Sequence, residues 1–232
     1  MTSEKIGTSW GPVPDRPVTI GDVIAWLRAH GSERNRAGMA RYGICADRAF
    51  GVSMPALRAF ARTLGRDHAL ALDLWASGVH EARILASLVD EPALVTAAQM
   101  DAWALDLEAW DVCDQCCLNL FRRTPHAWRR AHAWSRRRAE FVKRAGFSLF
   151  AVLAVHDKAA PDERFHEVFA AVEREAGDDR NFVRKSVNWA LRQAGKRNPA
   201  LRRAAVDCAR RLRALDSRSA RWIAADALRE LV

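Results

Sequence analysis

Five consecutive residues, Trp110-Asp111-Val112-Cys113-Asp114, combine an indole with two carboxylates. On a helix, Trp110 and Asp114 are four residues apart and share one face. A fixed carboxylate beside an aromatic face suits the stabilisation of a developing positive charge. The pattern also fits a structural role, in which Asp111 is the helix N-cap, Asp114 complements the helix dipole and Trp110 packs in the core. The segment alone leaves both interpretations open.

Two shorter features carry polar groups that could contact a ligand. Lys143-Arg144 lies in a helix that we predict over residues 141–155 and that is otherwise apolar. Taken alone, this pair fits a charged surface stripe on an amphipathic helix. Tyr42, the only tyrosine, follows Arg41, and its hydroxyl suits either a phosphate oxygen or simple packing. Neither feature by itself selects a function.

Asn188-Trp189 has cations one helical turn to either side. These cations are Arg184, Lys185 and Arg192. An aromatic ring among cations suits contacts with phosphates and sugars, although a tryptophan in a helix is more often a packing residue. The segment is therefore a candidate for nucleic-acid binding with a structural alternative.

The cysteines raise the question of a metal site. Cys113, Cys116 and Cys117 share a helical face, and together with His80 or His132 they could suggest a metal site. No second Cys/His pair follows at the spacing typical of zinc sites. We therefore expect small buried thiols that pack a helix, with no metal and no cofactor. The chain also has no Gly-rich phosphate loop, nucleophile elbow or kinase signature.

The charge of the chain is unevenly distributed. Its 232 residues include 37 Lys and Arg against 28 Asp and Glu, for a net charge of +9. Residues 1–116 carry a net −4, whereas residues 117–232 carry +13. A local excess of cations favours a polyanionic partner. Since 32 of the 37 cations are arginine, the excess also fits the solvated faces of a helical repeat protein, and charge alone does not decide.

The sequence also indicates a compartment. The first residues carry no apolar region behind a basic one, so no secretory signal is predicted. The longest apolar stretch, residues 147–155, is far shorter than the roughly 20 residues of a membrane helix. The five cysteines are an odd number and fit reduced thiols. We expect a cytoplasmic monomer with no membrane partner.

The elements that must position these residues are almost wholly helical. Apolar residues recur at three- and four-residue spacing, and no run alternates as a strand would. We expect about twelve helices of about ten to fifteen residues, after an irregular N-terminal arm at residues 1–17. Capping residues next to proline mark three helix starts: Ser53, with a helix through Thr63 and a stop at Gly65, Thr124-Pro125, and Asn198-Pro199.

The C-terminal half is self-similar. The segment from Phe141 to Leu153 is similar to the segment from Phe182 to Ala194 at an offset of 41, and residues 219–228 follow at a further offset of about 37. A helical period near 40 residues is typical of HEAT and armadillo repeats. Such helix pairs stack because each cannot bury its apolar face alone. We predict an all-α superhelical solenoid over residues 18–232, a single domain with a concave basic surface.

With these segments in view, the chain resembles the AlkD-like DNA alkylation repair proteins, a family of HEAT-like-repeat DNA glycosylases that remove alkylated purines. The resemblance runs from about Tyr42 to Asn198, and Ala109 stands where the family often has a second aromatic residue. Four segments carry it: Tyr42 with Phe50-Gly51-Val52, Trp110-Asp111-x-x-Asp114, Lys143-Arg144-Ala145, and Phe182-Val183-Arg184-Lys185 with Asn188-Trp189-Ala190-Leu191-Arg192.

The resemblance implies roles for individual residues. It makes Trp110 and Asp114 the catalytic pair. It also implies a set of residues that bind DNA through its backbone: Arg144, Trp189, Tyr42, Lys143, Lys185 and Arg192.

The implied reaction needs few groups. An N3- or N7-alkylated purine already carries a positive charge, so its base leaves as a neutral molecule without a general acid. A carboxylate and an indole face then stabilise the oxocarbenium-like sugar. The resemblance implies a monofunctional glycosylase of base-excision repair that acts on duplex DNA without base flipping, associated with the nucleoid. The alternatives are a non-catalytic HEAT-repeat module that binds DNA structures and a protein-interaction solenoid.

Overall fold

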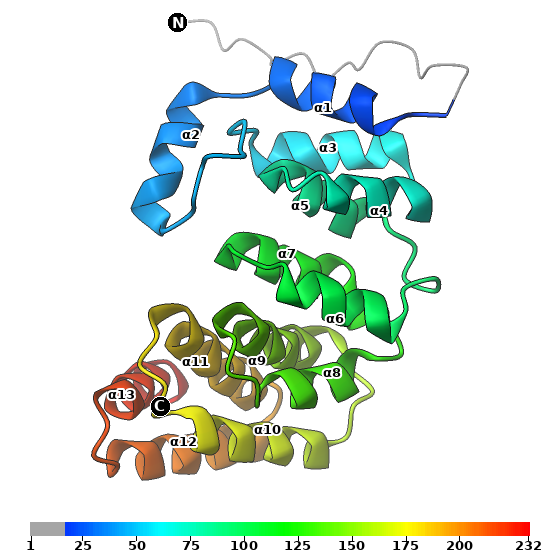
Figure 1. The fold of residues 1–232 in the computed structure, drawn as a ribbon. Helices are drawn as coiled ribbons and strands as arrows, with labels where there is room; N and C mark the ends of the chain where they lie inside the picture. The colour runs from blue at the N-terminus through cyan, green and yellow to red at the C-terminus, as the bar shows by residue number, and fades with distance from the viewer. Residues whose placement is uncertain (1–16) are drawn as a thin grey trace, which may run out of the picture. The chain divides into compact units, whose positions relative to one another are not determined.

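The computed structural model describes residues 17–232, and this part of the chain is all helical (Figure 1). It holds thirteen α-helices and two short 3-10 helices, with no β-strand in the described residues, which confirms the predicted all-α class. None of these helices is both long and apolar enough to cross a membrane. The irregular arm predicted for residues 1–17 lies, apart from Pro17, outside the described residues.

The chain divides into two compact units, residues 1–95 and 96–232. The single domain expected over residues 18–232 stays a prediction. The described part of the first unit contains α1 (Ile20–Ala29), α2 (Glu33–Met39), η1 (Ala40–Tyr42), α3 (Met54–Leu64), α4 (His68–Ala76) and α5 (His80–Val89). The second unit contains α6 (Ala97–Leu105), α7 (Trp110–Asn119), η2 (Phe121–Arg123), α8 (Ala127–Trp134), α9 (Glu140–His156), α10 (Asp162–Glu175), α11 (Asn181–Gly195), α12 (Pro199–Arg213) and α13 (Arg218–Leu231).

The second unit is built from stacked helix pairs. Helices α7, α9, α11 and α13 form one layer, in which α9 packs against α7 and α11, and α11 packs against α13 (Figure 1). Helices α8, α10 and α12 pair with α9, α11 and α13 respectively. The three segments with similar sequences are therefore α9, α11 and α13, which occupy equivalent places in the layer. The predicted repeat corresponds to one helix of each pair.

Helix α9 is the centre of this unit. All of its residues from Val142 to Ala154 are buried, which explains why its sequence is apolar almost all round. At Gly146 it passes close to the end of α8, where a Cβ would lie 2.4 Å from the backbone nitrogen of Ser135. Only glycine allows this approach, so the position of α9 against α8 depends on a single residue.

The predicted helix starts were right in two cases and wrong in one. Ser53 is the N-cap of α3, which ends at Gly65, and the Asn198 side chain accepts a hydrogen bond from Leu201 N–H at the start of α12. Helix α8, however, begins at Ala127 rather than at Thr124-Pro125. The Thr124 hydroxyl instead donates to the Phe121 carbonyl at 2.9 Å and ends the short helix η2.

Candidate functional site

Helix α7 places the candidate pair Trp110 and Asp114. The helix begins at Trp110, with Ala109 as its N-cap, so the structural alternative that made Asp111 the cap is wrong. Asp114 therefore lies in the second turn, on the side that faces α9. Trp110 is half-buried rather than part of the core.

Two side chains of α9 hold the Asp114 carboxylate. Arg144 approaches it side-on, with Nε donating to Oδ1 at 3.2 Å and Nη2 donating to Oδ2 at 2.7 Å. The Ser148 hydroxyl, one turn further along α9, donates to Oδ1 at 2.8 Å. The third guanidinium nitrogen, Nη1, donates to the carbonyl of Phe182 in α11 at 2.8 Å. One arginine thus connects three helices of the layer and orients the carboxylate.

The pair is asymmetric in its exposure. The Arg144 side chain is 6% exposed, whereas that of Asp114 is 19% exposed. Hydrogen bonds fix both oxygens of this partly accessible carboxylate. Such a group is suited to stabilise a bound cation, because the carboxylate does not need to change its orientation when the cation forms.

Burial and pairing act in opposite directions on these two groups. Burial raises the pKa of the Asp114 carboxyl above its usual range, while Arg144 and Ser148 counteract part of that rise. Burial also disfavours the charged form of Arg144, but the carboxylate of Asp114 outweighs it and raises the pKa of Arg144. A permanently charged guanidinium therefore stands against the Asp114 carboxylate.

Aromatic rings occupy the first turns of the layer helices. The Arg144 guanidinium carbon lies 5.8 Å from the centre of the Trp110 ring, and the rings of Phe141 and Phe182 lie 5.5 Å apart. In α13, the last helix of this layer, the side chain of Trp222 is 37% exposed. The guanidinium carbon of Arg184 lies 4.5 Å from the centre of the Trp222 ring.

Sequence reasoning missed the roles of Ser148, Phe182 and Trp222. The offset of the repeat is the signal that brings equivalent turns of α9, α11 and α13 together.

Lys143 is held inside the protein by ion pairs, and its contact with DNA stays a prediction. Its ammonium is buried and lies 2.6 Å from Glu175 and 3.0 Å from Asp178. These two carboxylates stand at the connection between α10 and α11. Each carboxylate also binds an arginine: Arg174 donates to Glu175, and Arg180 donates to Asp178. The role of Lys143 is therefore to hold that connection to α9.

The side chains of the remaining predicted DNA contacts are more accessible than that of Lys143. Arg192 pairs with Glu230 and lies 3.6 Å from Asp226 on α13, while Trp189 is half-buried and Lys185 is exposed. Three of these predicted contacts, Trp189, Lys185 and Arg192, lie in the second unit. Tyr42 belongs to the first unit, where it is 68% exposed in η1. DNA contact by these four residues stays a prediction.

The cysteines of α7 pack against α9. Cys113, Cys116 and Cys117 are fully buried, as expected, and the thiol of Cys117 donates to the carbonyl of Ala145 at 3.5 Å. Burial raises the pKa of the Cys117 thiol well above its usual range. Within residues 17–232, no group of three or more His, Cys, Asp or Glu side chains is arranged to hold a metal ion.

Comparison with known proteins agrees with this architecture. The model of a family described as "DNA alkylation repair enzyme" matches residues 23–231. One solved structure, described as "A new family of proteins related to the HEAT-like repeat DNA glycosylases with affinity for branched DNA structures", superposes with a TM-score of 0.78 at 19% identity. The match covers 92% of this chain and 96% of the other. No curated protein gives a significant match. The structural likeness confirms the HEAT-like repeat fold.

Proposed function

Because the chain belongs to the family of DNA alkylation repair enzymes, we propose that it hydrolyses the N-glycosidic bond of positively charged N3- and N7-alkylated purines in duplex DNA. The single observation that carries this proposal is the Asp114 carboxylate, which Arg144 and Ser148 anchor at both oxygens and which remains partly accessible. The reaction leaves a free base and an abasic site, and it cuts no strand.

The step balances with one water molecule. The bond between C1′ and the purine nitrogen breaks, and its electron pair neutralises the cationic base. The oxygen of water then bonds to C1′, and Asp114 accepts or directs the proton that this water loses. Before the water arrives, the sugar carries a positive charge that the anionic carboxylate stabilises. The indole face of Trp110, one turn earlier on α7, offers a second stabilising contact to the same cation.

Arg144 takes a different role in this mechanism from the phosphate contact implied by the resemblance. Each of its three nitrogens already donates to a protein acceptor. We therefore assign it as a positioning residue that acts through Asp114. The backbone of the duplex is left to exposed residues, among them Lys185. A site that acts on the sugar does not require the base to leave the stack.

The test is release of free base from a duplex that contains 7-methylguanine. The wild-type protein is expected to release the methylated base, and Asp114→Asn should slow release by about 10²- to 10³-fold while it still binds the duplex. Asp179→Asn removes an exposed carboxylate of the same unit and serves as the control with unchanged release. Wild-type rates of release by Asp114→Asn would exclude the assigned role.

A second candidate is a module that binds DNA structures without catalysis. The solved relative is described as having affinity for branched DNA, and residues 117–232 of this chain carry a net +13. This candidate predicts no base release from any alkylated duplex, together with binding that weakens steeply as salt rises. The release assay therefore separates the two functions.

A further inference from the structure

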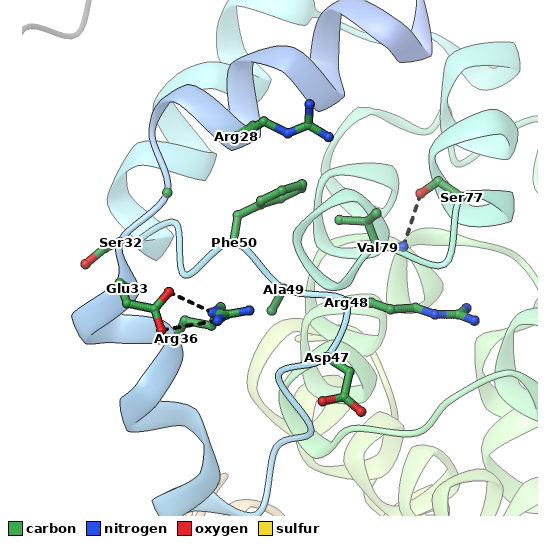
Figure 2. A pocket seen from close by; sticks show the side chains of 11 residues that line it. Arg28, Ser32, Glu33, Arg36, Asp47, Arg48, Ala49, Phe50, Ser77 and Val79 are labelled. Atoms are coloured by element: carbon green, nitrogen blue, oxygen red, sulfur yellow. Dashed lines mark hydrogen bonds and ion pairs between the residues drawn. The ribbon is translucent and has the colours of Figure 1, made fainter.

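The first unit contains a pocket that the proposed reaction does not use. Its volume is about 670 Å³, and its lining comes from α1, α2, the segment that leads to α3, and the turn between α4 and α5 (Figure 2). Three arginines, Arg28, Arg36 and Arg48, line the pocket together with Phe50 (Figure 2). The size is within the range of small-molecule sites.

The Phe50 ring is presented on a fixed stretch of backbone. The N–H groups of Phe50, Gly51 and Val52 all donate to the carboxylate of Glu81, which is 2% exposed. The carbonyl of Phe50 accepts a hydrogen bond from the N–H of Ser32 at 2.8 Å. The ring is half-buried and its backbone is held on both sides.

The wall formed by α2 is fixed to the same stretch. Gly51 has a positive φ of 78°, and a Cβ there would lie 2.3 Å from the carbonyl oxygen of Ser32 and 2.8 Å from the nitrogen of Arg36. The Asn35 side chain donates to the Gly51 carbonyl at 3.0 Å. The backbone around Phe50 and helix α2 are therefore fixed to each other. A pocket that is already formed lowers the entropic cost of ordering a ligand.

The arginines of the pocket differ in whether an acidic side chain compensates their charge. Arg36 donates two hydrogen bonds to Glu33, at 2.9 and 3.2 Å, so its charge is compensated. Arg28 lies 6.0 Å from the centre of the Phe50 ring, and the guanidinium of Arg48 lies against Gly78. Neither arginine makes an ion pair within residues 17–232. The other carboxylate of the pocket, Asp47, is exposed.

We propose that this pocket binds one unpaired nucleotide, with its base stacked on Phe50 and its phosphate paired with Arg28 or Arg48. A fixed aromatic ring next to cations is the combination that binds single-stranded nucleic acid, because every base offers a flat face and every linkage a negative charge. Guanidinium groups match the oxygens of a phosphate in two-point contacts. The nucleotide belongs either to a single-stranded arm of DNA or to a free mononucleotide. The site goes beyond the proposed reaction and does not depend on base release.

The test compares a forked duplex with single-stranded arms against a fully paired duplex of equal length. Binding is measured by fluorescence anisotropy for the wild type, Phe50→Leu, Arg48→Ala and Arg62→Ala. Phe50→Leu keeps an apolar side chain without the ring, and Arg62 is an exposed arginine of α3 outside the pocket. We expect Phe50→Leu and Arg48→Ala each to weaken fork binding by about tenfold relative to paired duplex, whereas Arg62→Ala keeps the wild-type ratio.

A second readout reports stacking directly. The fluorescence of 2-aminopurine in the unpaired arm should be quenched by the wild type and less so by Phe50→Leu at saturating protein. Addition of dAMP distinguishes the sources: displacement of the fork identifies a free nucleotide as a ligand, and no displacement restricts the site to a strand. The inference is overturned if both pocket variants, folded by circular dichroism, match the wild type with the fork and with dAMP. No alkylated base is needed, so this result and the release assay fail or succeed separately.

Discussion

Arg144 and Asp114 form a two-point ion pair between α9 and α7, with Nε 3.2 Å from Oδ1 and Nη2 2.7 Å from Oδ2. The guanidinium side of the pair is buried and the carboxylate side is partly open. The two residues are 30 positions apart in the chain, and the stacking of α7 on α9 brings them together. The packing of the repeats therefore orients the Asp114 carboxylate.

Replacing Arg144 changes the pH dependence of base release. In the proposed reaction, release requires the Asp114 carboxylate, whose pKa is raised by burial and lowered by Arg144. In Arg144→Gln only Ser148 still opposes the effect of burial, so the pKa of Asp114 rises further and activity is lost at a higher pH as the solution is acidified. The rate at neutral pH should fall by about 10²-fold because the carboxylate is also misplaced.

The measurement is the pH profile of the release rate under single-turnover conditions. Arg144→Lys restores the positive charge but not the two-point contact of the guanidinium. The pH at which release is lost on acidification should therefore return toward that of the wild type, while the rate at neutral pH stays low. Equal loss of rate at every pH, with an unmoved acid limb, would contradict the positioning role of Arg144.

Lys185 tests the DNA-binding surface predicted on α11. It is exposed and precedes Trp189 by one turn. Lys185→Ala should weaken duplex binding regardless of sequence and lower the slope of log K against log salt by about 1. Arg203→Ala, which removes an exposed cation from α12, is the matched control for net charge. Identical salt slopes for the two variants would remove Lys185 from the DNA surface.

Gly146 tests the close approach of α9 and α8. A Cβ at this position would lie 2.4 Å from the nitrogen and 2.9 Å from the Cα of Ser135, and backbone atoms cannot move aside as a flexible side chain can. Although alanine favours an isolated helix, Gly146→Ala should lower the free energy of unfolding by roughly 3 kcal/mol.

Urea unfolding at neutral pH measures this change. Gly177→Ala has no atom within 4 Å of the new Cβ and should be nearly neutral. Similar stabilities of the two variants would show that α9 shifts without cost.

Asp178 tests the buried network around Lys143. Burial alone would raise the pKa of Asp178, but hydrogen bonds from Arg180 and Lys143 lower it to about 2. Since an unfolded aspartate titrates near about 3.9, this carboxylate stabilises the fold fully above that pH and stops doing so as the pH falls toward about 2. Asp178→Asn should lower the free energy of unfolding at neutral pH by about 2 kcal/mol.

The same variant should flatten the decline in stability between about pH 4 and pH 2. Asp179→Asn changes the exposed neighbour and should keep the wild-type decline. An unchanged decline in Asp178→Asn would mean that other carboxylates account for acid unfolding.

Local patterns predicted much of this protein. The all-helical class follows from apolar residues at three- and four-residue spacing. The two helix starts follow from the residue types next to proline: Ser53 is an N-cap before Pro55, and the Asn198 side chain accepts a hydrogen bond from its own helix start. The repeat of α9, α11 and α13 follows from similarity at an offset near 40. Trp110 and Asp114 could be paired because four residues on one helix always share a face.

Which side chains meet across helices could not be predicted in this way. Lys143 and Arg144 are adjacent in the sequence, yet one holds Glu175 and Asp178 while the other holds Asp114. Successive residues of a helix point about 100° apart, so the register between helices decides the partner of each. That register depends on packing volumes and on close approaches such as Gly146, which involve residues far apart in the chain.

The same reasoning applies to Phe50. Its sequence neighbours suggest only a turn before a helix, because the acceptor for three of their N–H groups is Glu81, about 30 residues later. The sequence alone thus specified the helices, their repeat and the candidate Trp110–Asp114 pair, since these depend on spacing within one segment. The tertiary structure alone decided that Asp114 is anchored and partly accessible, that Lys143 is buried, and that Phe50 lines a pocket with three arginines, because burial and partnership are properties of segments brought together by packing.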